Sequence, residues 1–469
     1  MKFTRNEAIR SIESTQEWDI TIIGGGATGL GIAVDAASRG YKTLLIEKYD
    51  FAKGTSSKST KLVHGGVRYL ANGDVKLVMS ALKERGLIFK NAPHVSFVQS
   101  FVIPSYNFFG KMKFLIGLKL YDWLAGKLRI GKSTLLSKAE VIEKLPKVKQ
   151  KNLIGGIQYY DGQFDDARLA LNLGQTAHEN GAVVLNYAEA SAITKDAQGK
   201  VTGIEFIERE SNKKYSIKSK SVINATGIFV DDILKLDVAA HKNLVRPSQG
   251  AHIVIDKKFL GNVDALMIPE TSDGRVLFGV PWHGKVLLGT TDTPLNEHQI
   301  EPRPLEEEIE FILNTANAYL DNAPTRKDVL SVFAGLRPLA APTDKDSNST
   351  KEISRDHKLI TSTSGLVTIT GGKWTTYRKM AEETVDMAIS VGGLQPKACA
   401  TTTLQIHGYS TERRDGHWQV YGSDTEEIQK LVKIDSSLGN KLHPNFDFIE
   451  AEVVWASRNE MIYNIEDFL

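Results

Sequence analysis

The chain has 469 residues, enough for two or three domains with a substantial core. Its 58 lysines and arginines nearly balance 56 aspartates and glutamates, so the net charge of +2 predicts no bulk attraction to nucleic acid. The one cysteine, Cys399, excludes an intrachain disulfide, a cysteine-ligated zinc site and an iron–sulfur cluster built from this chain alone. Any electrons must therefore travel on an organic cofactor.

The sequence has neither a signal peptide nor a membrane span that hydropathy can identify. Residues 1–18 are polar and charged, without an apolar core region. No run of about 18 uncharged apolar residues occurs. We therefore expect the chain to face the cytosol.

A nucleotide-binding pattern follows the first predicted strand. Gly24, Gly26 and Gly29 have GxGxxG spacing, and a helix and a second strand, closed by Glu47, complete a βαβ unit. The glycines permit a tight turn, a close approach of backbone to a diphosphate, and packing of helix on strand. The helix N-terminus offers N–H groups to the diphosphate, and Glu47 would accept hydrogen bonds from a ribose hydroxyl. The pattern predicts a dinucleotide site.

The other elements follow from hydrophobic periodicity and from glycine and proline positions. In chain order, helices are expected over residues 1–17, 30–39, 75–91, 166–180, 302–320, 375–391, 425–432 and 449–461. Strands are expected over residues 18–23, 42–46, 182–186, 221–225, 252–255, 276–280, 286–290 and 366–370, with a hairpin over 192–206. The short strands between 246 and 295 indicate an antiparallel sheet and so a second domain. The polar composition of residues 340–352 predicts a surface loop.

The segment Lys111–Lys132 has two interpretations. Its apolar residues cover most of a helical wheel, which fits a buried helix with charged ends. Aromatic residues beside lysines are also what a membrane-surface segment uses on anionic lipid, with Phe114, Leu118 and Trp123 as the expected contacts. The residues alone leave both open.

Two glycine motifs at strand ends indicate the type of cofactor. Ala225-Thr226-Gly227 follows one predicted strand, and Gly371-Gly372 stands where another strand passes into a helix. At that junction, N–H groups at the start of the helix can face a carbonyl oxygen that gains negative charge. A reduced flavin has such an oxygen and nicotinamide does not. The motifs therefore favour a flavin.

Cationic and imidazole side chains near these glycines suggest an anionic substrate. Arg337 lies between a glycine and a proline, and a planar guanidinium binds phosphate or carboxylate through two hydrogen bonds. His64 and His252 are candidate bases for a hydroxyl proton. Lys373, at a helix start, opposes the helix dipole, which makes a purely structural role less natural. No HExxH or P-loop occurs, and no metal site is expected.

Several blocks together resemble one family, the FAD-dependent respiratory glycerol-3-phosphate dehydrogenases. The resemblance covers about residues 18–395. The blocks are residues 19–47, 55–57 (TSS), 61–70 (KLVHGGVRYL), 165–169 (DDARL), 224–227 (NATG), 289–292 (GTTD), 335–339 (GLRPL) and 371–378 (GGKWTTYR). Residues from Glu452 onward resemble the start of the family's helical C-terminal domain, which we expect to be truncated at Leu469.

The resemblance implies a fold and a division into domains. The fold class is α/β: a Rossmann-type FAD-binding domain, an antiparallel-sheet substrate domain as in amino-acid oxidases, and a helical C-terminal domain. The FAD-binding domain would comprise residues 16–95, 160–245 and 330–395. The substrate domain would comprise 96–159 and 246–329, and the C-terminal domain 400–469.

The resemblance also implies the reaction. It is oxidation of sn-glycerol 3-phosphate to dihydroxyacetone phosphate, with hydride passing to FAD N5 and electrons to a membrane quinone. The chain would act in glycerol metabolism as a peripheral protein on the cytoplasmic face of the cell membrane, in contact with anionic lipid. Its oligomeric state is open, a homodimer being one option.

Site residues are carried over by matching motif. The catalytic candidates are His64, Arg337 and His252. The substrate-binding candidates are Arg68, Tyr69, Arg337, Arg355 and Lys373. The candidates for binding non-covalent FAD are Gly24, Gly26, Ala27, Thr28, Gly29, Glu47, Lys48, Thr55, Ser56, Ser57, Lys61, Leu62, His64, Gly65, Gly66, Ala225, Thr226, Gly227, Gly372, Lys373 and Thr375.

Two other functions remain open. An oxidase would pass electrons to oxygen and release peroxide, but the extra inserted segment common in such oxidases is absent from this sequence. A non-catalytic flavoprotein that binds phosphate esters is the alternative of another class. Retention of Arg68, Arg337, His64 and Lys373 together argues against it.

Overall fold

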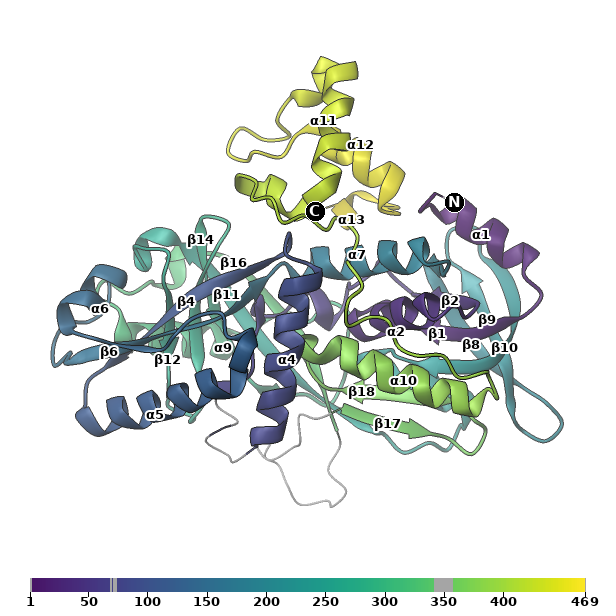
Figure 1. The fold of residues 1–469 in the computed structure, drawn as a ribbon, viewed down its shortest axis with the longest axis horizontal. Helices are drawn as coiled ribbons and strands as arrows, with labels where there is room; N and C mark the ends of the chain where they lie inside the picture. Colours follow the sequence, from purple (N-terminus) through teal and green to yellow (C-terminus); the bar gives the residue numbers. More distant parts are fainter. Residues whose placement is uncertain (1, 68–69, 71–73, 341–356, 469) are drawn as a thin grey trace.

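Two β-sheets lie side by side along the long axis of the molecule, and the C-terminal helices stand on top of them (Figure 1). This computed structural model describes residues 2–67, 70, 74–340 and 357–468. The predicted fold class is confirmed by this arrangement together with the family comparisons given below.

The first sheet is built around parallel strands that are buried on both faces. Its order is β17-β18-β10-β1-β2-β7, with β8 and β9 extending from β10. The strands are β1 (Trp18–Ile23), β2 (Thr43–Ile46), β7 (Val183–Leu185), β8 (Ala188–Lys195), β9 (Val201–Glu208), β10 (Lys213–Asn224), β17 (His357–Thr361) and β18 (Val367–Gly371). Because parallel strands are covered by helices on their faces, they consist of nearly continuous apolar runs such as Ile20, Ile22 and Ile23.

Three long helices, α2 (Ala27–Ser38), α7 (Asp166–Glu179) and α10 (Tyr377–Val391), pack beside one another on the first sheet (Figure 1). The close contact of α2 with α10 depends on glycine: a Cβ on Gly31 would lie 2.7 Å from the Tyr377 ring. Helices α1 (Arg5–Ser14) and α8 (Val230–Asp237) also belong to this half of the molecule. This packing fixes the strand ends where β1 and β10 present their glycines.

The second sheet is mainly antiparallel and has the order β15-β11-β14-β13-β12-β4-β6-β3, with β16 beside β11 and β5 beside β6. Its strands are β3 (Leu62–Val63), β4 (Ser96–Ser105), β5 (Thr134–Leu136), β6 (Gly155–Phe164), β11 (Val245–Asp256), β12 (Ala265–Ile268), β13 (Leu277–Trp282), β14 (Lys285–Gly289), β15 (Thr293–Pro294) and β16 (Val329–Ala340). One face packs on α6 (Lys138–Lys144) and α9 (Glu306–Tyr319). The other face is turned toward the cavity described below.

The proposed domain boundaries stay a prediction, and strand pairing favours adjustments to them. β3 and residues 160–164 of β6 pair within the second sheet, as does β16. β16 pairs with β11 along its whole length, for example Arg337 with Ser248. Residues 330–340 therefore belong with the substrate sheet rather than with the FAD-binding domain to which we had assigned them.

The C-terminal region is anchored on α7. It contains α11 (Thr425–Ile434), α12 (Glu450–Asn459) and α13 (Ile465–Phe468). Arg168 on α7 forms an ion pair with Glu460 at 2.7 Å. His407 lies between Glu179 of α7 and Asp424, which precedes α11.

Most predicted elements occur within a few residues of their expected bounds, including α4 (Val75–Asn91). The helix expected to start at Thr375 differs: Trp374–Thr376 is a 3-10 turn, and the α-helix begins at Tyr377. Two consecutive glycines with positive φ, Gly371 and Gly372, precede this turn. They change the chain direction more sharply than a direct strand-to-helix passage would.

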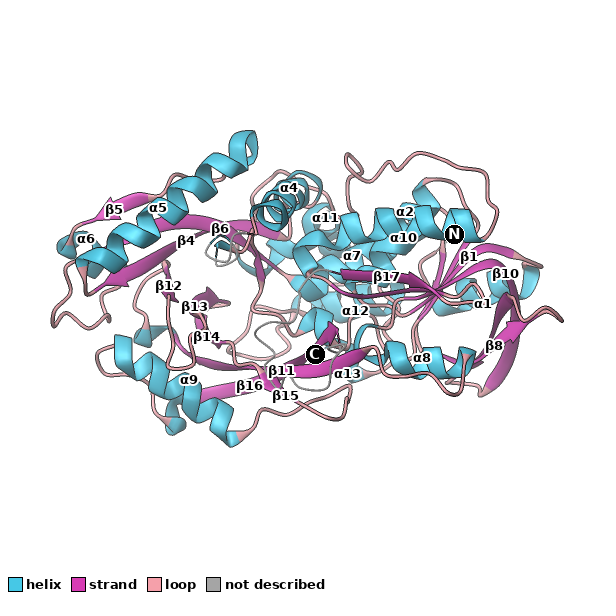
Figure 2. Ribbon diagram, turned by 90° about the horizontal axis from the view of Figure 1, so that it is seen from below, coloured by secondary structure: helices cyan, strands magenta, loops and turns pink. Residues whose placement is uncertain are grey.

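Helix α5 (Phe108–Ala125) lies beside β4 and β6, at the opposite edge of the sheet from α9 (Figure 2). The expectation that Leu118 contacts a membrane is wrong, because Leu118 is fully buried. Phe114 is partly buried against the same core. Trp123 does face outward, with 75% of its surface exposed. Over the described ranges, no helix has both the length and the apolar character that a bilayer crossing requires.

Candidate active site

A cavity of about 650 Å³ is lined by residues of both sheets. Glu47, Lys48 and Glu189 line one end, near the first sheet. His252 and Arg337 of the second sheet line another part of it. The volume is within the range of about 300–1,000 Å³ typical of ligand and cofactor sites.

The glycine turn after β1 is shaped for close backbone contact. Gly24 has a φ of +114°, and a Cβ there would lie 2.7 Å from the Ala225 carbonyl oxygen. A Cβ on Gly29 would overlap the carbonyl oxygen of Gly24, and Gly29 does not line the cavity. Gly29 therefore allows α2 to pack on the turn, and Gly24 allows the turn to pack on the end of β10, while Gly24 and Gly26 both line the cavity.

Glu47 is oriented by the backbone. Its carboxylate accepts hydrogen bonds from the N–H groups of Gly25, at 2.6 Å, and Tyr49, at 2.8 Å. Burial raises the pKa of Glu47, and these two hydrogen bonds oppose that effect. The carboxylate remains in the cavity wall, where its other lone pairs can accept from ribose hydroxyls.

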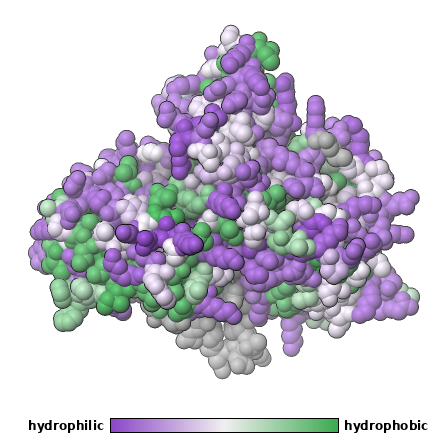
Figure 3. All heavy atoms as spheres, in the orientation of Figure 1, coloured by the Kyte–Doolittle hydropathy of each residue, from purple (hydrophilic) through white to green (hydrophobic). Residues whose placement is uncertain are grey.

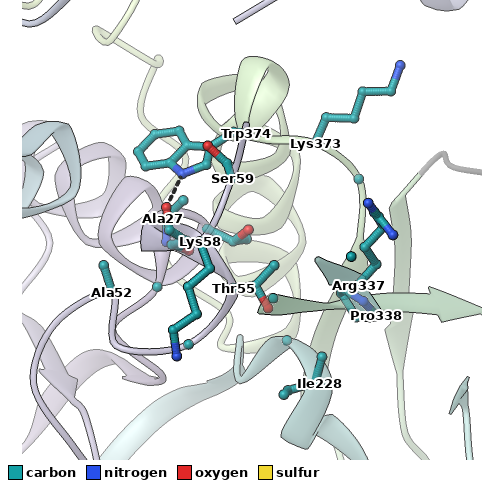
Figure 4. A pocket seen from close by; sticks show the side chains of 18 of the residues that line it. Ala27, Ala52, Thr55, Lys58, Ser59, Ile228, Arg337, Pro338, Lys373 and Trp374 are labelled. Atoms are coloured by element: carbon teal, nitrogen blue, oxygen red, sulfur yellow. Dashed lines mark hydrogen bonds between the residues drawn. The ribbon is translucent and has the colours of Figure 1, made fainter. Parts of the chain in front are cut away.

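The segment Thr55–Ser57 joins three parts of the site. The Ser56 hydroxyl accepts from the Ala27 N–H at the start of α2, at 2.9 Å. The Ser56 carbonyl accepts from the Trp374 indole N–H at 2.8 Å, the dashed line in Figure 4. The Thr55 hydroxyl donates to the Leu336 carbonyl of β16 at 2.6 Å. These bonds hold the loop against both sheets.

Lys61 supports this loop from outside the cavity. Its ammonium forms an ion pair with the buried Asp166 at 2.6 Å and donates to the Ser57 carbonyl at 2.7 Å. Asp166 also accepts from the Ser59 hydroxyl at 2.6 Å. The candidates Ser57 and Lys61 are thus absent from the cavity wall, as is Gly65.

Arg337 reaches the cavity from β16. Its guanidinium donates to the Thr290 hydroxyl at 3.1 Å and faces Asp292 at 3.4 Å. Figure 4 shows its side chain on the same side of the cavity as Lys373, away from Ala52. Two cationic side chains on one side of a cavity suit an anionic substrate.

His252 is a neutral imidazole. It is 2% exposed, stacks on Phe333 with ring centroids 4.8 Å apart, and has its Nε2 2.9 Å from the Thr60 hydroxyl. Burial, with the charges of Arg337 and Lys61, lowers its pKa to about 3. A base this weak holds a proton poorly, which favours a hydrogen-bonding role.

The other predicted site residues either line the cavity or lie outside the described residues. The cavity wall contains the candidates Gly24, Gly26, Ala27, Thr28, Glu47, Lys48, Thr55, Ser56, Leu62, His64, Gly66, Ala225, Thr226, Gly227, His252, Arg337, Gly372, Lys373 and Thr375. Arg68, Tyr69 and Arg355, like most of the predicted surface loop at 340–352, lie outside the described residues.

The sequence reasoning missed an apolar part of the cavity. Phe101 of β4, Tyr159 of β6, Met267 of β12 and Phe278 of β13 line it. Strand pairing places Phe101 opposite Tyr159 and Met267 opposite Phe278. In β13 the alternation of Phe278, Val280 and Trp282 predicts a buried face without saying that the face borders a ligand site.

Comparisons with known proteins identify the family. The FAD-dependent oxidoreductase family model matches residues 19–378, and the model for the C-terminal domain of alpha-glycerophosphate oxidase matches residues 362–469. The mitochondrial glycerol-3-phosphate dehydrogenase of Saccharomyces cerevisiae is 39% identical over 99% of this chain and 80% of its own length. The chain belongs to the FAD-dependent glycerol-3-phosphate dehydrogenase family. The enzyme of Mesocricetus auratus is 40% identical over 96% of this chain and 66% of its own length.

Solved structures agree with this membership. The glycerol-3-phosphate dehydrogenase of Bacillus halodurans, complexed with FAD, is 32% identical with a TM-score of 0.75, covering 99% of this chain and 87% of that one. The L-alpha-glycerophosphate oxidase of Mycoplasma pneumoniae shares the fold at 16% identity and a TM-score of 0.64. The predictions that this family member is an FAD-dependent oxidoreductase and that FAD is its cofactor are confirmed.

Proposed function

We propose that this dehydrogenase oxidises sn-glycerol 3-phosphate to dihydroxyacetone phosphate. The observation that carries the proposal is the position of Arg337: its guanidinium lies in the wall of the cavity that also contains the dinucleotide fingerprint. When bound, FAD supplies an acceptor for a hydride at N5. The chain has to hold the phosphate, orient the secondary alcohol and take its hydroxyl proton.

The cofactor would be held along the cavity by residues already positioned for it. Gly24, Gly26, Ala27 and Thr28 of the turn line the cavity at the start of α2, which fits binding of a diphosphate there. Glu47 would bind the adenosine ribose. His64, Gly66, Gly372 and Thr375 would border the ring system, since they line the part of the cavity between the two sheets.

The substrate phosphate would be bound by Arg337 and Lys373. Thr290 and Asp292 orient the guanidinium, so little rotamer freedom is lost when an anion binds. Arg68 and Arg355, outside the described residues, remain proposed contributors. Holding the phosphate also holds the secondary alcohol carbon, which is next to the carbon that carries the phosphate. Hydride leaves from this secondary alcohol carbon.

His64 is our candidate for accepting the hydroxyl proton. It lines the cavity, and its backbone N–H donates to the Thr375 hydroxyl at 3.2 Å. Burial lowers the pKa of His252, the alternative, to about 3, which makes it a weak base. We assign His252 to orienting Thr60 or the substrate.

An anaerobic titration tests the proposed reaction. Adding sn-glycerol 3-phosphate to the FAD-loaded enzyme should bleach the yellow flavin stoichiometrically, whereas glycerol, which lacks the phosphate, should not at the same concentration. Dihydroxyacetone phosphate should form in equal amount. A flavin that stays oxidised would contradict the proposal and favour a non-catalytic flavoprotein.

We propose a membrane quinone as the electron acceptor. The apolar wall formed by Phe101, Tyr159, Met267 and Phe278 is unnecessary for a small phosphorylated triol and suits an apolar ring. A water-insoluble acceptor also requires the protein to approach a bilayer. Rapid release of peroxide when air is admitted to the reduced enzyme would instead identify the oxidase alternative.

Helix α5 is the proposed membrane contact, on the cytoplasmic leaflet. Phe109, Ile116 and Trp123 are 87%, 67% and 75% exposed, and Lys113 is exposed beside them. Figure 3 shows hydrophobic atoms gathered at the lower left of the molecule, over the place of α5 in Figure 1. Apolar side chains interleaved with lysine suit the interface of an anionic bilayer.

A further inference from the structure

A buried charged cluster lies beneath the loop that carries His64. It joins Arg85 of α4, Tyr121 of α5 and Asp161 of β6, which are 1%, 2% and 3% exposed. Arg85 forms an ion pair with Asp161 at 2.9 Å, and the Tyr121 hydroxyl donates to the other carboxylate oxygen at 2.6 Å. The charges are thus paired, as a buried carboxylate requires.

The Tyr121 hydroxyl also accepts a hydrogen bond from the backbone of the loop. The Gly65 N–H donates to it at 2.7 Å. A side chain at position 65 would not fit, because a Cβ would lie 2.6 Å from the Tyr121 oxygen. The contact therefore depends on glycine in the loop and on a hydroxyl in the helix.

The direction of these bonds is set by Asp161. Burial and the neighbouring Asp161 carboxylate raise the pKa of Tyr121 well above its ordinary value, so the hydroxyl keeps its proton. That proton is given to Asp161, which leaves an oxygen lone pair for Gly65. In such a chain each hydrogen bond polarises the next and strengthens it.

The loop is held on two sides by two consecutive N–H groups. Gly65 donates to Tyr121 of α5, and His64 donates to Thr375, which precedes α10 of the FAD-binding half. With both bonds made, the backbone from which the His64 side chain extends is fixed between the two halves of the molecule.

We propose that Tyr121 is a positioning residue, which through Gly65 sets the place of His64 beside the flavin and the substrate. The proposal rests on the proposed function, because His64 is there the acceptor of the hydroxyl proton. Tyr121 itself is not in the cavity wall, whereas Asp161, which accepts its hydrogen bond, is. Its effect is transmitted through the backbone, so a loss of position should reduce turnover more than substrate affinity.

The test is Tyr121→Phe in the full-length, FAD-loaded enzyme. We expect bound FAD per chain to stay near the parent value, kcat with a soluble dye acceptor to fall about 10- to 100-fold, and KM to change less than about threefold. The flavin absorption bands should also shift. The matched control is Tyr106→Phe, which loses a hydroxyl that donates to the Lys149 carbonyl at 3.0 Å, remote from the loop.

Two results would overturn the proposal: an FAD-loaded Tyr121→Phe enzyme with parental kcat and spectrum, or an equal loss of kcat in Tyr106→Phe.

If Tyr121→Phe fails to fold, the hydrogen bond from His64 to Thr375 provides the test. Thr375→Val removes the acceptor of the His64 N–H and Thr375→Ser keeps it, so kcat should be several-fold higher in the serine variant. Equal kcat in the two would contradict the proposal. If sn-glycerol 3-phosphate does not bleach the flavin of the parent enzyme, that result contradicts the proposed function instead. The shift of the flavin absorption bands in Tyr121→Phe would still test whether Tyr121 positions the loop.

Discussion

At the scale of single residues, side chains at this site are oriented before any ligand binds. The backbone orients Glu47, Thr290 and Asp292 orient Arg337, and Thr60 and Phe333 orient His252. Groups held in this way lose little conformational entropy on binding. Substitutions here should therefore act on geometry as well as on charge.

Glu47→Ala should weaken FAD retention. The variant loses the proposed ribose hydrogen bonds, each worth about 1.5–3 kcal/mol for a charged acceptor, and leaves the Gly25 N–H without its partner. FAD per chain after dilution and gel filtration measures the effect. Glu189→Ala, at the same end of the cavity, is the control. If Glu47→Ala retains as much flavin as the parent, Glu47 does not bind the ribose.

Arg337→Lys should impair turnover much more than flavin content. Lysine keeps the charge but loses the planar fork that Thr290 and Asp292 orient. A displacement of about 1 Å can cost about 100-fold, so kcat/KM should fall by that order. Steady-state kinetics on FAD-loaded protein provides the measurement. Parental kcat/KM would remove Arg337 from the substrate site.

At the scale of elements, helix α5 has two different faces. Leu118 and Tyr121 are buried and face the core, whereas Ile116 and Trp123 face outward. The lysines of this helix also differ in role. Lys111 and Lys119 donate to the Leu136 and Ser133 carbonyls, so charge reversal there would disturb the fold as well as any lipid contact.

Replacing Ile116 and Trp123 with glutamate should weaken binding to vesicles that contain anionic lipid. The double variant removes exposed apolar surface and adds repulsion, and each basic residue near such a surface contributes about 1 kcal/mol. Co-sedimentation at low and physiological salt measures binding. Ile434→Glu is the control, since Ile434 is 83% exposed in the C-terminal region. Unchanged binding of the double variant would exclude α5 as the membrane contact.

The attachment of the C-terminal region should depend on pH through His407. Burial alone would lower its pKa, but hydrogen bonds to Asp424 and Glu179 outweigh it and raise the pKa to about 9. Between about pH 6.5 and 9 the folded state therefore binds more protons than the unfolded state. The stabilisation is complete below pH 6.5 and is lost as the pH rises through 9.

Limited proteolysis of the C-terminal region at pH 7 and pH 10 measures this loss. Cleavage should accelerate at pH 10 in the parent enzyme. His407→Gln, which cannot be charged, should be cleaved faster than the parent at pH 7 and change less between the two values. An equal acceleration in both proteins would assign the pH dependence to other groups.

At the scale of the whole molecule, the cavity lies between the two sheets. Its wall contains Glu47, which follows β2 of the first sheet, His64, which follows β3, and Arg337 of β16 in the second sheet. A cofactor bound along this cavity contacts both halves. Its binding should therefore stabilise their arrangement and not only the βαβ unit.

Removing FAD should lower the thermal stability of the entire dehydrogenase. A ligand that binds only the folded state stabilises it by about 2.7 kcal/mol at 100 times its Kd. Scanning calorimetry of the apoprotein, the reconstituted protein and the reconstituted protein in excess FAD should give a rising Tm in that order. A Tm independent of FAD would mean that FAD does not bind preferentially to the folded state.

The sequence by itself determined the nucleotide-binding half and the class of cofactor. The GxGxxG turn, the strands on both sides and Glu47 are close together in the chain, so local propensity and spacing specify them. Gly371 and Gly372 were identifiable for a similar reason, because two consecutive glycines at a strand end imply a particular backbone path. Family blocks spread over the chain then identified the enzyme.

Only the tertiary structure decided which side chains of residues 61–64 face the cavity. Lys61 and His64 are three residues apart, yet Lys61 pairs with Asp166 outside the cavity while His64 lines it. Tyr121, far along the chain, accepts a hydrogen bond from the backbone of Gly65, next to His64. Leu118 and Trp123 belong to the same helix and have opposite exposure, because α5 packs one face on the second sheet. Such outcomes depend on long-range packing, which the spacing of residues along a chain does not encode.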